Sequence, residues 1–218
     1  MWPALRAAVA DLSHLLGRGY AEVAALELVG NRHQLTVRQR MAVRRCACTD
    51  TQRSSRVARR VGIERWLGAA LAVDGFNVLT TVEVALAGGV LLRARDACLR
   101  DIASMHGSFR RVEETEPALR HLADVLAEAR PARVLWILDR PVGNSGRLAQ
   151  RIRGLSAAMA LPWSVELHDR ADAALRGAPM AIATADSAIL DAIGPWLDLA
   201  SVAVARLGAG PIVDLAAE

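Results

Sequence analysis

The stretch "LAVDGFNVLT" (residues 71–80) decides the fold of this chain. Its first three residues are apolar and predict a buried strand, which ends at Asp74 and Gly75. An apolar helical pattern begins at Asn77. A charged residue at the inner end of a core strand is costly unless another group pairs with it. The stretch therefore predicts a strand followed by a helix, with a carboxylate and a carboxamide at the junction.

Alternating strand and helix patterns continue from this stretch to the end of the chain. Apolar runs predict strands at 71–73, 134–138, 163–167, 180–183 and 202–205. Helical patterns lie between them at 77–92, 116–129, 145–160 and 187–193. Apolar strands separated by helices predict a mainly parallel sheet covered on both faces. We therefore expect an α/β domain over residues 68–218. Its least regular part, 95–117, is expected to form a flap or an irregular helical excursion. Asp96 and Asp101 could supply a further carboxylate there, but we expect them on the solvated surface.

A different, arginine-rich region precedes this domain. Apolar spacing predicts helices at 4–16, 20–29 and 36–47, the last capped by Thr36. All 27 basic residues of the chain are arginine, and residues 1–70 hold 12 of them against 5 acids. Residues 71–218 hold 15 arginines against 18 acids. The asymmetry predicts an anion-binding helical region, residues 1–67, attached to a domain that carries the site.

Two interpretations of the arginine-rich region remain open. Nine arginines and one acid, Asp50, lie between Arg32 and Arg60. They could form a solvated helix face with a linker. Alternatively, they could contact the phosphate groups of nucleic acid, where each neutralised phosphate adds salt-sensitive affinity.

The ends of the chain and its cysteines narrow the class of protein. The N-terminus lacks a basic segment followed by an unbroken apolar run, and no apolar run approaches the roughly 20 residues that span a bilayer. We therefore expect a soluble, cytoplasmic protein without membrane contact. Three cysteines form neither a disulfide framework nor a paired zinc signature. The sequence leaves the oligomeric state open, a homo-oligomer included.

Several predicted strands end in aspartate. Asp74, Asp139 and Asp186 follow three strands directly, and Asp172 lies shortly after a fourth. Because the carboxyl ends of parallel strands share one edge of a sheet, these carboxylates should converge. Two carboxylates about 4 Å apart repel by about 4 kcal/mol at an effective dielectric near 20. Either one holds a proton or a divalent cation neutralises them, and oxygen ligands favour Mg²⁺ or Mn²⁺. Alternatively, each aspartate simply caps the following helix.

Four short motifs resemble, in order, those of the PIN-like nucleases, especially the NYN branch: "VDGFNVL", "ILD", "RADAAL" and "ATADSAI". The resemblance implies a three-layer α/β domain that hydrolyses phosphodiester bonds, preferably of RNA, with Mg²⁺ or Mn²⁺. The positions that match the family's acids are Asp74, Asp139, Asp172 and Asp186, the first, second and fourth of which would hold the metal. Asn77 matches the polar companion of the first acid, and Thr184 and Ser187 match the hydroxyl residues beside the last.

The chain departs from this pattern after its second predicted strand, where "DRPVGNSGRLAQRI" (139–152) replaces the usual loop. "PVGNSGR" lacks the spacing and the lysine of a P-loop. Asn144, Ser145 and Arg147 could still bind a phosphate at a helix N-terminus, or the run could be a turn with Ser145 as the cap. The whole chain also resembles a prokaryotic family described only as a domain of unknown function, which implies no activity.

Three hypotheses for the function follow. The first is a metal-dependent nuclease, whose activity would depend on the aspartates. The second is a non-catalytic nucleic-acid-binding or assembly module with a degenerate PIN-like fold, which would bind RNA regardless of metal. The third is a nucleotide- or phosphometabolite-binding enzyme that uses the "PVGNSGR" loop.

Overall fold

A computed structural model describes residues 1–102 and 113–216 of the chain. Its N-terminal part consists of four helices: α1 (Trp2–Gly17), α2 (Glu22–Arg32), α3 (Val37–Cys46) and α4 (Asp50–Arg59). Thr36 caps α3 and Thr49 caps α4, each in a reciprocal capping box with a glutamine three residues later. The predicted cap at Thr36 is therefore confirmed. A 3₁₀ turn, η1 (Ile63–Trp66), leads from α4 toward the sheet.

The main sheet has five parallel strands. They are β1 (Ala70–Asp74), β4 (Arg133–Asp139), β5 (Trp163–His168), β6 (Ala181–Ala183) and β7 (Trp196–Leu197), in the order β5-β4-β1-β6-β7. From β1 the chain moves outward through β4 and β5, then crosses back to β6 and β7 on the other side. The predicted α/β class with a mainly parallel sheet is thus confirmed, and β1 and β6 flank the point where the strand order reverses.

Helices cover both faces of this sheet. Alternate residues of each strand point to opposite faces, so each strand contributes side chains to both helical layers. Leu71 and Val73 of β1 pack with α5 (Gly75–Leu86), α6 (Thr115–Ala129), α7 (Ser145–Ala158) and α10 (Leu199–Leu207). Ala72, between them, packs on the other face with α8 (Ala171–Gly177) and α9 (Ser187–Leu190). The sheet therefore forms the middle of three layers.

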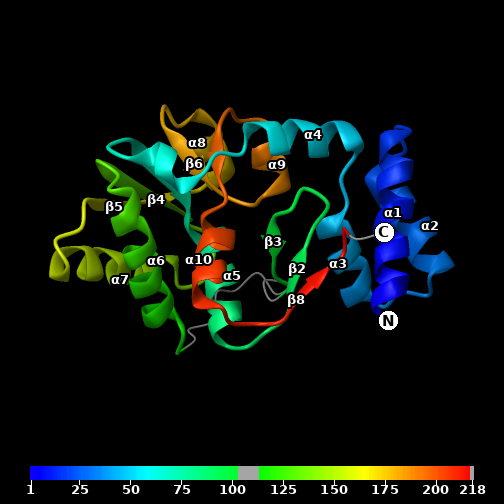
Figure 1. The fold of residues 1–218 in the computed structure, drawn as a ribbon, viewed down its shortest axis with the longest axis horizontal. Coiled ribbons are helices and arrows are strands. Elements are labelled where there is room, and N and C mark those ends of the chain that lie inside the picture. Colours follow the sequence, from blue (N-terminus) through cyan, green and yellow to red (C-terminus); the bar gives the residue numbers. More distant parts are fainter. Residues whose placement is uncertain (103–112, 217–218) are drawn as a thin grey trace.

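A second, smaller sheet joins this unit to the N-terminal helices. It has the order β3-β2-β8, with β2 (Leu91–Arg93) antiparallel to β3 (Leu99–Arg100) and parallel to β8 (Ile212–Asp214). Leu92 and Leu215 belong to the same apolar cluster as Leu5 and Leu12 of α1. In Figure 1 β2 and β8 lie between the main sheet and α1–α3, while α4 runs back toward α9. The expected boundary between residues 67 and 68 stays a prediction.

Three predictions are wrong, two about secondary structure and one about exposure. Residues 202–205 lie in α10 rather than in a strand, because an apolar run that is buried on a helix looks like a core strand. The helix expected at 77–92 ends at Leu86, and its last residues enter β2. Asp96 and Asp101 are buried rather than solvated. Of the irregular segment expected at 95–117, residues 103–112 lie outside the described residues, whereas Leu99–Arg100 form β3 and α6 begins at Thr115.

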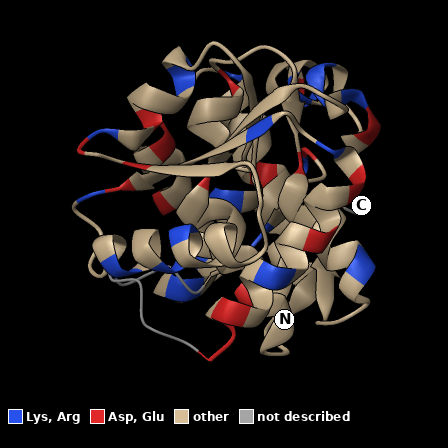
Figure 2. Ribbon diagram, turned by 90° about the vertical axis from the view of Figure 1, so that its left-hand side faces the viewer, with Lys and Arg blue, Asp and Glu red and all other residues tan. Residues whose placement is uncertain are grey.

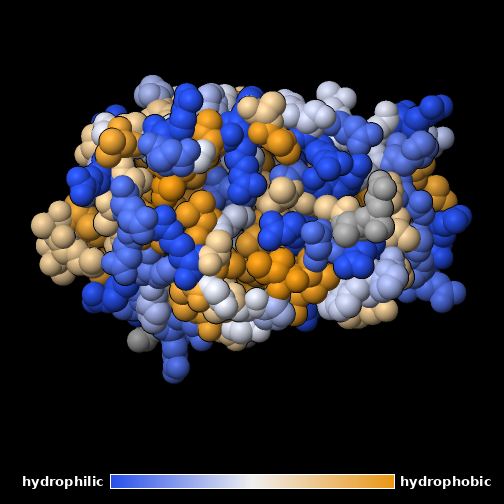
Figure 3. Space-filling view, viewed as in Figure 1, coloured by the Kyte–Doolittle hydropathy of each residue, from blue (hydrophilic) through white to orange (hydrophobic). Residues whose placement is uncertain are grey.

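Two further features are the apolarity of the helices and the hydropathy of one face of the molecule. None of the helices in the described part of the chain is long and apolar enough to cross a membrane. On the face that Figure 3 shows, hydrophobic side chains emerge in the middle of the molecule and hydrophilic ones surround them.

Candidate active site at the carboxyl edge of the sheet

Asp74 ends β1, and α5 begins at the next residue. A side chain at Gly75 would collide with Leu138, and its Cβ would lie 3.1 Å from the carbonyl oxygen of Ile137. Glycine therefore lets the chain turn from strand to helix directly against β4. The turn leaves Asp74 at the carboxyl edge of the sheet with 9% of its surface exposed.

Hydrogen bonds tie the end of β1 to the end of β6. The Thr184 hydroxyl donates to Asp74 Oδ2 at 2.7 Å and accepts from the Asp186 amide at 3.0 Å. The Ala185 amide donates to Asn77 Oδ1 at 2.8 Å. In open parallel sheets, ligands bind outside the carboxyl ends of the strands where the strand order reverses. This junction lies at that place in the sheet.

The aspartates at this edge influence one another. Burial raises the pKa of Asp74 to about 7, the Thr184 hydroxyl opposes this, and the charges of Asp186 and Asp139 add to it. The pKa of Asp139 is also raised, first by burial and then by Asp172. Asp74 thus lies within electrostatic reach of Asp186 on one side and of Asp139 on the other, and Asp139 lies within reach of Asp172.

The carboxylate oxygens at this edge decide whether a divalent cation can bind there. Within residues 1–102 and 113–216, no three His, Cys, Asp or Glu side chains converge as a metal-binding group. Asp186 Oδ1 accepts from the Ala188 and Ile189 amides at 2.8 and 3.2 Å, so Asp186 caps α9. Mg²⁺ is commonly held by one or two carboxylates and several waters. Asp74 and Asp186 are two carboxylates of the kind that hold such an ion, whereas the described residues form no site of three carboxylates.

The other predicted residues are divided between this edge and structural contacts. Ser187 Oγ lies 3.4 Å from Arg56 Nη1 and accepts a hydrogen bond from it. Asn144, Ser145 and Arg147 follow β4 at the same edge as Asp139, and Arg147 is exposed. The Ser145 hydroxyl donates to the Arg140 carbonyl at 2.9 Å, and Asn144 occupies the cap position. The "PVGNSGR" run therefore forms a turn in which Ser145 is not the cap.

A buried ion-pair network that the sequence did not predict supports the β6–α9 loop. Arg56 of α4 donates to both carboxylate oxygens of Asp191 at 2.7 and 2.8 Å and to Asp96 Oδ2 at 2.8 Å. Arg100 donates to both oxygens of Asp96 at 2.9 and 2.7 Å. These two arginines hold the pKa of Asp96 at about 2, although burial acts in the opposite direction.

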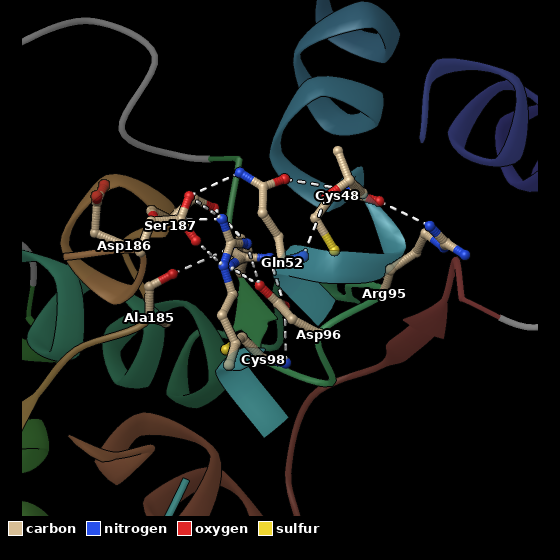
Figure 4. Close-up of polar contacts among 12 residues, drawn as sticks. Cys48, Gln52, Arg95, Asp96, Cys98, Ala185, Asp186 and Ser187 are labelled. Carbon is tan, nitrogen blue, oxygen red and sulfur yellow. Dashed lines mark hydrogen bonds and ion pairs between the residues drawn. The ribbon is translucent and has the colours of Figure 1, made fainter. Parts of the chain in front are cut away.

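The same arginines also hold the backbone on either side of Asp186. Arg100 Nε donates to the Ala185 carbonyl at 3.1 Å, and Arg56 Nη2 donates to the Ser187 carbonyl at 3.3 Å. Figure 4 shows Asp96, Ala185 and Ser187 around this network, with Asp186 at its margin. The N-terminal region thus helps to position a residue of the candidate site. The arginine at position 56 carried no local signal of burial, because its helix otherwise looks solvated.

The fold and the site define an α/β protein with a five-stranded parallel sheet, an N-terminal helical region and an acidic, partly buried site at the strand-order reversal. The chain belongs to the family defined by the domain of unknown function DUF5616, which matches residues 63–202. Residues 4–59 match a second family, the protein of unknown function DUF434.

A relative from an archaeon extends this comparison. The chain is 27% identical to the uncharacterized protein MJ0935 of Methanocaldococcus jannaschii over 180 residues, which cover 83% of this chain and 86% of the relative. The predicted resemblance to a family of unknown function is therefore confirmed. No solved structure matches the chain.

Proposed function

We propose that this protein hydrolyses phosphodiester bonds, with RNA as the preferred substrate, and that it uses Mg²⁺ or Mn²⁺. The observation that carries the proposal is the group of aspartates at the strand-order reversal, where Asp74 is buried with its pKa raised to about 7. The ordered resemblance of the four motifs to PIN-like nucleases supports the same function. A PIN-like fold in the narrower sense is part of this proposal.

Asp74 and Asp186 would hold the cation, and Asp139 and Asp172 would complete the acidic edge. A bound divalent cation supplies charge neutralisation and polarises the phosphate. The protein's own residues have separable tasks. Thr184 fixes the Asp74 carboxylate through its hydroxyl, and Asn77 holds the loop that carries Asp186 through the Ala185 amide. Loss of a proton from Asp74 near pH 7 would prepare the site for the cation.

The arginines of the N-terminal region support a nucleic-acid partner only in part. Arg56, Arg59 and Arg60 are held by protein groups: Arg56 by Asp96 and Asp191, Arg59 by the Ile193 carbonyl, and Arg60 by Asp198. Acidic residues lie among the basic ones in Figure 2. The region is thus mixed, because Arg56, Arg59 and Arg60 make contacts within the protein, whereas others, such as Arg38, reach solvent. Contact of the solvent-exposed arginines with phosphate stays part of the proposal.

The proposal is tested by incubating the purified chain with labelled single-stranded RNA and DNA, with Mg²⁺, Mn²⁺ or EDTA. We expect cleavage of RNA with either cation and none with EDTA. Asp74→Asn and Asp186→Asn should each lower the rate by about 100-fold or more. Asp124→Asn, on the exposed face of α6, is the matched control and should cleave normally.

Two other results would count against hydrolysis. Salt-sensitive RNA binding that ignores metal and persists in both aspartate variants, without cleavage, would favour the non-catalytic binding module. An inert protein that binds neither RNA nor Mn²⁺ would contradict the proposal altogether.

A further inference from the structure

A cavity of about 780 Å³ lies between the N-terminal helices and the candidate site. Residues of α1, α3 and α4 line one side, and residues of α5, β3 and the β6–α9 loop line the other. Asn77 and Asp186 are among them, so the cavity opens directly beside the candidate site. Its volume is within the range of about 300–1,000 Å³ typical of small-molecule sites.

The lining combines an apolar part with charged groups. Leu12, Leu16, Met41 and Phe76 supply apolar surface to the cavity. Four arginines and four acids line it as well, so its formal charge is balanced. Apolar and aromatic surface can hold a planar base, because any nucleic-acid base can stack on an aromatic side chain. The ligand that suits this lining has a planar, weakly polar ring joined to an anionic group.

The four arginines differ in whether they can accept such an anion. Arg56 and Arg100 are buried and are matched by the carboxylates of Asp96 and Asp191. Removing them from those partners would leave buried charges uncompensated, which is strongly unfavourable. They are therefore structural.

Arg44 and Arg45, in the last turn of α3, have more accessible contacts. Arg44 pairs with Glu22, and both side chains are about half exposed. Arg45 donates to the Asp101 carbonyl at 2.6 Å and pairs with the Asp101 carboxylate at 3.7 Å, but 31% of its side chain is exposed, unlike those of Arg56 and Arg100. An exposed ion pair contributes only about 0–1 kcal/mol, so a doubly charged phosphate can replace Glu22 as the partner of Arg44. The guanidinium group matches phosphate with two parallel hydrogen bonds.

We propose that this cavity binds a nucleoside phosphate, either free or as the terminal nucleotide of a strand. The base packs against Phe76 and Met41, and Arg44 and Arg45 hold the phosphate. The inference goes beyond phosphodiester hydrolysis, because binding requires neither the divalent cation nor cleavage. It also gives the N-terminal region a role in selecting the ligand.

The test is isothermal titration calorimetry of the full chain in EDTA, which separates this site from any metal-dependent reaction. The probes are AMP, adenosine, inorganic phosphate and a short 5′-phosphorylated oligonucleotide. We expect AMP or the oligonucleotide to bind at least about tenfold more tightly than adenosine or phosphate, because only they use both parts of the lining. The stronger of the two identifies the source of the nucleotide.

Two variants and a control assign the binding to this cavity. Arg44→Gln and Arg45→Gln should each weaken the tighter probe by about tenfold, the loss expected for a charge-assisted hydrogen bond. Arg44→Gln removes an exposed side chain, so an unchanged circular dichroism spectrum will show that this variant folds. Arg53→Gln, exposed on α4 and outside the cavity lining, should bind normally. Failure of every nucleoside phosphate to bind, or binding that both cavity variants leave unchanged, would overturn the inference even if metal-dependent cleavage is found.

Discussion

Asp74 has a role in the fold, as the end of a core strand, and a role in the proposed chemistry, as a ligand of the cation. It is buried at the end of a core strand, and the structure gives it one direct side-chain donor, Thr184, rather than a cationic partner among the described residues. Burial without a cation raises its pKa to about 7. A buried carboxyl with this pKa carries an unfavourable free energy whenever it is ionised. A divalent cation or a proton relieves that cost.

The pH dependence of stability should report this cost. In the folded chain Asp74 holds its proton up to about pH 7, whereas in the unfolded chain it ionises near its ordinary pKa of 3.8. The folded state therefore binds more protons in this window, so the free energy of unfolding falls as pH rises from 4 to 7. A tenfold difference between the acid dissociation constants of the folded and unfolded states corresponds to about 1.4 kcal/mol.

Asp74→Asn removes this titration. Urea unfolding in metal-free buffer should show that the stability of the variant relative to the wild type increases by a few kcal/mol between pH 4 and pH 7. Above pH 8 the difference should be constant. A relative stability that stays flat across the window would mean that Asp74 is ionised throughout.

At the scale of elements, α4 and the β6–α9 loop are joined through Arg56. Its side chain is 2% exposed and contacts Asp96, Asp191 and the Ser187 carbonyl. The network holds a helix of the N-terminal region, the β2–β3 turn and the loop of the candidate site. These three segments, which Arg56 joins, lie far apart in the sequence.

Arg56→Ala should destabilise the protein by about 3–5 kcal/mol, because it leaves Asp96 buried with one partner fewer and Asp191 without its bidentate partner. The measurement is the midpoint of urea unfolding at pH 7.5. Arg53→Ala, exposed on the same helix, should change the free energy of unfolding by no more than about 0.5 kcal/mol. Similar losses in both variants would show that the network contributes little to stability.

The elements also show how far the sequence could predict this molecule. β1, β4 and β5 were evident because continuous apolar runs followed by turn residues are typical of buried parallel strands. β7 has only two residues, and β2 mixes leucine with arginine, so neither carries a strand pattern. The nearness of Asp74 to Asp186 followed from the strand ends alone. The network around Asp96 did not, since Arg56, Asp96 and Arg100 each look like surface charges in their local sequence.

At the scale of the whole molecule, the N-terminal helices and the α/β unit are not independent. Leu92 and Leu215, from the second sheet, complete the apolar cluster of α1–α3, and Arg6 Nε donates to the Asp214 carbonyl at 2.8 Å. The proposed nucleotide cavity lies between the two parts. The helical region therefore supplies a wall of that cavity and supports the loop that carries Asp186.

The central claim is that the acidic edge of the main sheet binds a divalent cation, and direct titration with Mn²⁺ tests it. At pH 8 calorimetry should show one Mn²⁺ per chain, with weaker binding at pH 6 because Asp74 must lose its proton. Asp74→Asn and Asp186→Asn should each weaken the affinity by about tenfold or more, whereas Asp124→Asn should not change it. A wild-type chain that does not bind Mn²⁺, or aspartate variants that bind it equally well, would contradict the claim.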